Sequence, residues 1–163
     1  MRLTLIALLA AVSALHAQTN DAWKNLNFLL GDWVGIGGQT NPQLGAGQGS
    51  FSFKSDLKEK IIIRRNNAQY DSGAQHDDLM VIYLGAAADT PRAIYFDSEG
   101  HVIRYTLSFP SPQRVVFESE DGQPGPKYRL SYWIENSSLN GRFEIAATPG
   151  DYKTYLSWKS KKQ

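Results

Sequence analysis

The stretch HVIRYTLSF, residues 101–109, alternates two kinds of side chain with a period of two. One set is apolar or aromatic and comprises Ile103, Tyr105, Leu107 and Phe109. The other set is mostly polar and comprises Val102, Arg104, Thr106 and Ser108. Successive side chains of a β-strand point to opposite faces, so this pattern predicts a strand with one face in a core and the other in water.

The same alternation recurs along the chain, which makes strands the dominant predicted element. It is found in YRLSYWIE, residues 128–135, in 139–146 and 152–159, and around Phe51 and Phe53. The predicted inward faces of the three C-terminal strands are Tyr128, Leu130, Tyr132 and Ile134; Leu139, Gly141, Phe143 and Ile145; and Tyr152, Thr154, Leu156 and Trp158. In LMVIYL, residues 79–84, both faces are apolar, which predicts a more enclosed strand.

Short turn sequences separate these runs and predict how the strands connect. Ser98–Gly100 reads as a hairpin loop, whereas the longer polar stretch Asn66–Asp78 is predicted to be a loop without strands. Short connections favour antiparallel neighbours. About ten strands without a crossover helix therefore predict an all-β fold, an antiparallel up-and-down β-barrel, because closure removes exposed sheet edges. Short turns at both ends and the polar C-terminal KSKKQ favour a barrel in water over a membrane barrel.

The first 17 residues have the composition of a secretory signal peptide. A cationic start at Arg2 precedes an apolar run from Leu3 to Leu15, and a small residue follows at Ala17. This run is shorter than the roughly 20 residues that a membrane-spanning helix needs. We expect cleavage after Ala17, with cleavage after Ala14 as the alternative, and a single barrel domain over residues 18–163. The mature protein is then predicted to be periplasmic or secreted.

Charge and cysteine content exclude several classes of function. The chain has 17 Lys and Arg against 16 Asp and Glu, and cleavage of the signal would also remove Arg2. A near-neutral chain lacks the basic face with which proteins displace counterions from nucleic-acid phosphates. With no cysteine, the chain has no disulfide, no thiolate metal site and no cysteine nucleophile. We therefore expect no nucleic-acid partner, and the sequence leaves a protein partner open.

The segment NFLLGDWVGIGG, residues 27–38, precedes the run of strands. Asn20–Asp21 is a plausible helix N-cap, and Trp23, Leu26 and Leu30 fall at spacings of three and four. This predicts a short N-terminal helix that ends at Gly31. The first strand then begins on Trp33.

A short helix followed by Gly-x-Trp and a meander of strands resembles the opening of the lipocalins and the wider calycin group. The segments LNFLLGDWVGIGG and IYFDSEGHVIRY are similar to bacterial exported lipocalin-like proteins of unknown function. The resemblance implies that Gly31 and Trp33 are structural: the tryptophan would pack across the closed end of the barrel, with the helix capping that end. It also implies a basic residue packed on the tryptophan, for which Lys159 and Arg142 are the candidates.

A haem-binding branch of small barrels has a similar, glycine-rich opening. That branch uses a histidine near its C-terminal strands, whereas the two histidines after the signal are His76 and His101. Haem binding is therefore a minor alternative. We otherwise predict no cofactor and no metal.

Few residues suggest catalysis. His76, Asp77 and Asp78 are consecutive, so on a strand their side chains would not converge, and we interpret them as a solvated loop end. His101 is expected to make a local contact with Asp97 or Glu99. The chain contains no nucleophile elbow, phosphate loop or His-Glu-x-x-His motif.

Polar groups predicted to face the interior are more informative. If Ile61 and Ile63 point inward, Glu59 and Arg65 point inward with them. The tyrosines predicted on inward faces are Tyr105, Tyr128, Tyr132 and Tyr152. Buried charge is costly unless it is paired, so these groups indicate either an internal ion pair or a wet cavity with a polar ligand group, unless they lie at strand ends and reach solvent.

These patterns favour an exported barrel that binds a small, mostly apolar molecule in its interior and is not an enzyme. One alternative is an isomerase or hydrolase on the same barrel that uses Glu59, Arg65 or a tyrosine. The other is a barrel filled by its own side chains that acts through its surface. The volume of the interior distinguishes them, because a filled interior would exclude both the ligand-binding barrel and the enzyme.

Overall fold

The computed structural model describes residues 23–37, 39–41, 45–85 and 91–163. The predicted signal peptide and its cleavage site lie outside these residues. The strands are β1 (Gly31–Gly35), β2 (Gln39–Asn41), β3 (Gly45–Asp56), β4 (Ile61–Tyr70), β5 (Gln75–Leu84), β6 (Pro91–Asp97), β7 (Val102–Ser111), β8 (Arg114–Ser119), β9 (Lys127–Glu135), β10 (Ser138–Ala146) and β11 (Lys153–Lys162).

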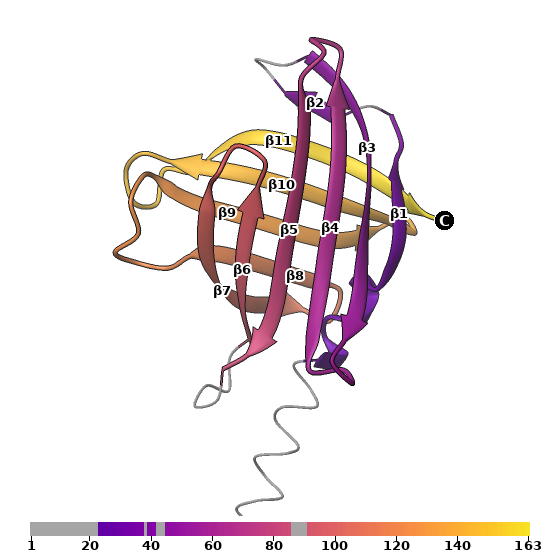
Figure 1. Ribbon diagram of the computed structural model, residues 1–163, viewed down its shortest axis with the longest axis vertical. Coiled ribbons are helices and arrows are strands. Elements are labelled where there is room, and N and C mark those ends of the chain that lie inside the picture. Colours follow the sequence, from indigo (N-terminus) through magenta and orange to yellow (C-terminus); the bar gives the residue numbers. More distant parts are fainter. Residues whose placement is uncertain (1–22, 38, 42–44, 86–90) are drawn as a thin grey trace, which may run out of the picture.

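The strands form one closed antiparallel barrel (Figure 1). Each strand from β3 to β11 pairs with its neighbour in sequence, and β1 closes the sheet by pairing with both β3 and β11. The short β2 also pairs with β3 and β11, so β1 and β2 occupy one position in the sheet. The barrel therefore has ten strand positions, as the alternating pattern predicted. In the part of the chain described, no helix is long and apolar enough to cross a membrane.

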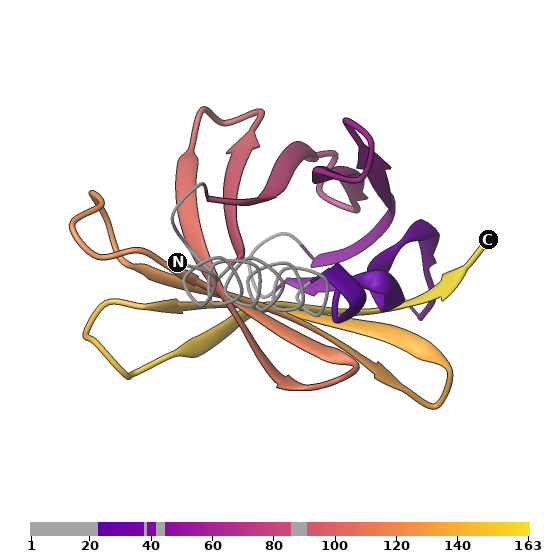
Figure 2. The ribbon, with the colours of Figure 1, turned by 90° about the horizontal axis from the view of Figure 1, so that it is seen from below.

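Of the predicted N-terminal helix, Trp23 and Lys24 are helical among the described residues, and a short 3₁₀ turn, η1 (Asn27–Leu29), follows at one end of the barrel (Figure 2). Leu29 donates its backbone N–H to the carbonyl oxygen of Leu26 at 3.0 Å. A 3₁₀ helix has three residues per turn, so Leu26 and Leu29 share a face, and both are fully buried. Leu30, predicted on the same helical face, is partly buried against the core. The predicted N-cap at Asn20–Asp21 lies outside the described residues.

Trp33 closes this end of the barrel, which is the place that the resemblance implied. Its side chain is buried, and its Nε1 donates a hydrogen bond of 2.7 Å to the carbonyl oxygen of Leu29. The ammonium of Lys162 lies 5.7 Å from the ring centroid. The basic partner of the tryptophan is therefore Lys162, and both sequence candidates were wrong: Arg142 lies over Trp133, and Lys159 is exposed.

Side chains fill the half of the barrel next to this closed end. An aromatic group is centred on Tyr132, whose ring lies 5.5–6.2 Å from those of Phe51, Phe53, Phe117 and Trp158. Wholly buried aliphatic side chains complete the packing, namely Leu26, Leu29, Met80, Ile82, Val115 and Leu139. On β5, predicted to be enclosed, Met80 and Ile82 of the inner face are inaccessible to solvent, whereas Leu79, Val81 and Tyr83 of the outer face are only partly buried.

The polar stretch 66–78 is not a loop. Strand β4 continues to Tyr70, β5 begins at Gln75, and the two pair from Ile61↔Tyr83 to Gln69↔Gln75. Side chains still alternate here between the inner and outer faces of the sheet, but polar residues occur on both faces. The loop prediction was wrong because it treated low hydrophobicity as a break in the strand.

Strand β11 contains a β-bulge opposite Phe143 and Glu144 of β10. Phe143 pairs with Leu156, but Glu144 pairs with Thr154, so Tyr155 is the extra residue. A bulge inserts one residue and reverses the alternation on its far side. The inward face of β11 therefore follows the predicted pattern at Leu156 and Trp158 but not before Tyr155.

Candidate functional site

A cavity of about 500 Å³ occupies the half of the barrel that side chains do not fill. It lies toward the β4–β5, β6–β7, β8–β9 and β10–β11 turns, at the end opposite Trp33. Its apolar and aromatic lining includes Ile103, Tyr105, Tyr128, Leu130, Phe143, Ile145, Leu156 and Trp158. The cavity size and apolar wall are typical of a site for a small organic molecule.

The structure brings two of the predicted interior tyrosines together in this cavity. Tyr105 is almost wholly buried and Tyr128 is partly buried, and both line the wall. Tyr132 is fully buried as predicted, but it packs in the aromatic group beneath the cavity. Burial raises the pKa of Tyr132 to about 12.

The predicted inward positions of Glu59 and Arg65 were wrong. Glu59 is exposed in the β3–β4 turn, where Leu57, Lys58 and Glu59 all have positive φ. Arg65 is exposed on the outer face. The run Ile61–Ile63 is apolar at every position and so does not fix the phase of β4. The inward residues are Ile62 and Arg64, one place away from the predicted set.

The prediction for Tyr152 was also wrong. Tyr152 lies on the outside, where the guanidinium of Arg129 is 4.0 Å from its ring centroid, and Arg129 also pairs with Glu144. The β11 bulge is the cause, because it reverses the faces of the residues before Leu156. Tyr155 lines the cavity instead.

Sequence reasoning missed an ion pair inside the barrel, between Arg64 and Asp78. The two side chains are only 6% and 4% exposed, and Asn66 donates a further hydrogen bond to Asp78 at 3.0 Å. Burial disfavours the charge of Arg64, but Asp78 outweighs this and raises the pKa of the guanidinium. Arg64 Nε has no hydrogen-bond partner, and Arg64 lines the cavity. The doublet Arg64-Arg65 was a usable signal, since one of two adjacent strand residues must face inward.

His76 joins Asp78 at the cavity wall, so the interpretation of residues 76–78 as a solvated loop end was wrong. The Nε2 atom of His76 lies 3.1 Å from the hydroxyl of Tyr95 and 3.4 Å from Oδ2 of Asp78. Its Nδ1 atom lies 2.9 Å from Oε2 of Glu99. Asp77 points outward, as alternation requires. Hydrogen bonding to Asp78, helped by Glu99 and opposed by burial, raises the pKa of His76 to about 9, so the imidazole is charged at neutral pH.

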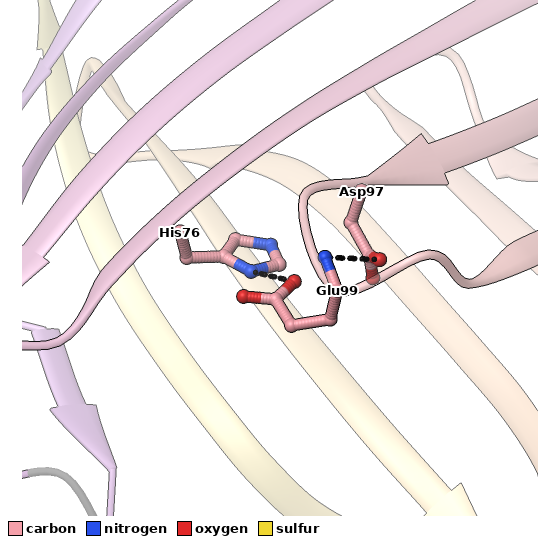
Figure 3. Close-up of side chains that lie close together, drawn as sticks. All are labelled: His76, Asp97 and Glu99. Atoms are coloured by element: carbon pink, nitrogen blue, oxygen red, sulfur yellow. Dashed lines mark hydrogen bonds and ion pairs between the residues drawn. The ribbon is translucent and has the colours of Figure 1, made fainter.

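Asp97 continues this polar network into the β6–β7 turn. It accepts hydrogen bonds from Tyr95 Oη at 3.3 Å, from the backbone N–H of Glu99 at 3.1 Å and from the backbone N–H of His101 at 2.8 Å. The predicted local contact of His101 is confirmed, with Nδ1 2.8 Å from Asp97 Oδ2. Burial opposes ionisation of Asp97, but the hydrogen bonds from His101 prevail and lower its pKa. Figure 3 shows His76, Asp97 and Glu99 gathered between β5 and this turn.

The site thus combines an apolar wall with one polar side. Burial raises the pKa of Tyr95 and of Tyr105, so both phenols remain protonated and can donate hydrogen bonds. The charged imidazole of His76 is likewise a donor at neutral pH and not a general base. This arrangement suits binding and orientation of a ligand better than proton abstraction.

Comparisons with known proteins support the fold. No protein-family model and no curated protein matches the sequence. Among solved structures, the chain is similar to Rv2717c from M. tuberculosis, with a TM-score of 0.61 and 14% sequence identity. The match covers 87% of this chain and 97% of that one. At this identity the likeness shows a shared barrel fold and nothing about activity.

Proposed function

We propose that the protein is an exported, lipocalin-like barrel that binds a small, mostly apolar molecule in its cavity. The observation that carries the proposal is the cavity of about 500 Å³, whose wall is mainly apolar and aromatic. The opposite half of the same barrel is filled. Protein interiors are close-packed, so a void of this size beside a complete core favours a ligand site. Export rests on the signal-like sequence Met1–Ala17.

The polar side of the cavity supports a ligand that carries a hydrogen-bond acceptor. Arg64 is 5% exposed and its Nε–H lacks an acceptor, although the group lines the cavity. An unpaired buried donor is costly, and a ligand oxygen would remove that cost only if Arg64 turned its Nε, which is now shielded from solvent, toward the cavity. Asp78 already balances the charge of Arg64. The acceptor favoured here is therefore uncharged, such as a carbonyl, ether or hydroxyl oxygen, on an otherwise apolar molecule.

The two other functions considered for this chain have less support. The proposed enzyme relied on Glu59, Arg65 or a tyrosine as acid or base. Glu59 and Arg65 are exposed outside the barrel, and burial raises the pKa of Tyr105, which makes this phenol a poor base. A barrel filled entirely by its own side chains would have no cavity.

A cavity-filling substitution tests the binding proposal. Ile145 lines the cavity, so Ile145→Trp should reduce the affinity for a dye that fluoresces in apolar sites by at least about tenfold. The matched control is Val102→Trp, because Val102 is 57% exposed on the outer face. Equal dye affinity in the two variants would show that the cavity is not the binding site.

Native mass spectrometry of protein purified from its own source would then identify a bound molecule. The proposal expects a non-covalent adduct of a small organic compound that is absent from Ile145→Trp. N-terminal sequencing of the same material tests export, with a start at Gln18 expected. A chain that begins at Met1 would contradict export but not ligand binding.

A further inference from the structure

We propose that His76, Asp97 and Glu99 form a binding site for one divalent transition-metal ion, with Zn²⁺ as the reference ion, beside the cavity. One ligand atom from each residue lies within 4.8 Å of the other two, as Figure 3 illustrates. All three residues also line the cavity. The inference does not depend on the proposed organic ligand, since metal binding and cavity binding are measured separately.

Strand pairing brings the three residues together from separate parts of the chain. His76 lies at the start of β5, Asp97 ends β6, and Glu99 lies in the turn before β7. The register Asp78↔Asp97 fixes β5 against β6, which places the turn beside His76. The Asp97 side chain is only 5% exposed and that of His76 28%, so two of the three ligands are held by the barrel wall. This is more order than a group of surface carboxylates has.

A second set of contacts, outside the three proposed ligands, orients the imidazole. Histidine ligands usually donate the ring N–H that does not face the metal to a carboxylate or another polar group. In His76 that nitrogen is Nε2, which faces Asp78 and Tyr95, while Nδ1 faces Glu99. Asp78 is itself fixed by Arg64 and Asn66. The buried ion pair thus fixes the carboxylate of Asp78, which in turn orients the imidazole so that Nδ1 is directed at Glu99.

The donor set determines the class of ion. One imidazole nitrogen and two carboxylate oxygens suit Zn²⁺ and similar borderline ions, whereas Mg²⁺ and Ca²⁺ prefer all-oxygen sites. Two carboxylates match the charge of a divalent cation. Three protein ligands leave at least one coordination position open, and because these residues line the cavity, a ligand in it could occupy that position.

Metal titration of the full-length mature chain tests the inference. Zn²⁺ bound at Nδ1 replaces the proton that the charged imidazole carries there, so isothermal calorimetry should show one Zn²⁺ bound per chain with release of that proton to the buffer, and much weaker binding of Mg²⁺ and Ca²⁺. Co²⁺ should give visible absorption bands that report nitrogen and oxygen ligands and disappear when Zn²⁺ is added. Lack of Zn²⁺ binding at millimolar metal would overturn the proposal.

Two variants and a control locate the site. Glu99→Gln removes a half-exposed carboxylate and should weaken Zn²⁺ binding at least about tenfold, and His76→Gln should do the same. Glu118→Gln changes an exposed carboxylate on the outer face of β8 and should bind as the wild type does. Circular dichroism and thermal unfolding establish that each variant is folded. If a folded Glu99→Gln variant binds Zn²⁺ with unchanged affinity, these residues are not the site.

The dye assay on metal-free protein separates this inference from the proposed function. Dye binding without Zn²⁺ binding would contradict the metal site alone. Zn²⁺ binding without dye binding would contradict the cavity ligand alone.

Discussion

Trp158 lies directly against Gly141 on the neighbouring strand, and a Cβ atom added at position 141 would stand 2.1 Å from Cε2 of the indole ring. The two residues are cross-strand partners of β10 and β11. Only a residue without a side chain leaves the ring in this place, where it packs on Tyr132 and lines the cavity. The glycine thus shapes both the core and the cavity wall.

Gly141→Ala should therefore destabilise the protein by about 1–3 kcal/mol, the usual cost of overpacking a core. Urea denaturation measures the loss. The control is Gly35→Ala, where the added Cβ would meet the carbonyl oxygen and the nitrogen of Gly49 at 3.4 Å and 3.8 Å, which are ordinary contact distances. A Gly141→Ala variant as stable as the control would show that the indole ring moves aside freely.

Trp33→Ala should destabilise the protein by about 3–5 kcal/mol, because it removes a large aromatic side chain from a core. Trp33 is 4% exposed and also donates a hydrogen bond to Leu29. Trp133→Ala is the matched control: this ring is partly buried on the outer face between Arg114 and Arg142, so a much smaller loss is expected. A loss well under 1 kcal/mol for Trp33→Ala would contradict its role in closing the barrel.

Removing either member of the Arg64–Asp78 pair should have unequal effects. In Asp78→Asn, Arg64 keeps its buried charge without its carboxylate partner, and a loss of about 3–5 kcal/mol is expected. In Arg64→Met, Asp78 still has Asn66 and His76 as partners, so the loss should be clearly smaller. Chemical denaturation at neutral pH measures both. Equal losses would show that Asn66 and His76 do not compensate the carboxylate.

Tyr132→Phe should be nearly neutral for stability at pH 7, because the buried hydroxyl has no hydrogen-bond partner to lose.

The effect of Tyr132→Phe on stability should appear at alkaline pH. The pKa of Tyr132 is raised to about 12, so the stability that depends on the neutral phenol is intact below pH 10. It falls between pH 10 and 12, because only the unfolded chain then releases the proton, by about 1.4 kcal/mol per pH unit. The slope of unfolding free energy against pH in this interval should be shallower in Tyr132→Phe than in the wild type. Identical slopes in the two proteins would show that the loss of stability comes from the ionisation of groups other than Tyr132.

The fold was predictable because the polarity of side chains alternates with a period of two in every strand that has one face in the core and the other in solvent. The runs around Tyr105, Leu130 and Leu139 each had the correct phase, and the buried residues confirm it. The position of Trp33 was implied by the resemblance of Gly31 and Trp33, at the start of the first strand, to the opening of the lipocalins.

The candidate site was predicted less well because two local features hide the phase of a strand. The Ile61–Ile63 run has no polar residue that shows which face is outward. The prediction therefore placed Arg65 inside the barrel, where Arg64 lies. One inserted residue in β11 reversed the faces of the strand, so Tyr152 was predicted inside the barrel where Tyr155 lies. A single shift moves every side chain on that stretch to the other face. The polar cluster of His76, Asp78 and Asp97 was missed for a different reason, since its members meet only through strand pairing that no local pattern reveals.

The division of the barrel into a filled half and a hollow half has an evolutionary consequence. The packing that stabilises the fold is concentrated around Tyr132. The residues that would determine ligand specificity line the cavity, near the turns at the end of the barrel opposite Trp33. Substitutions at Ile145 or Tyr128 change the shape of the cavity while the aromatic group beneath stays intact. On the proposed function, single substitutions of wall residues would change which molecule is bound while leaving the aromatic core in place.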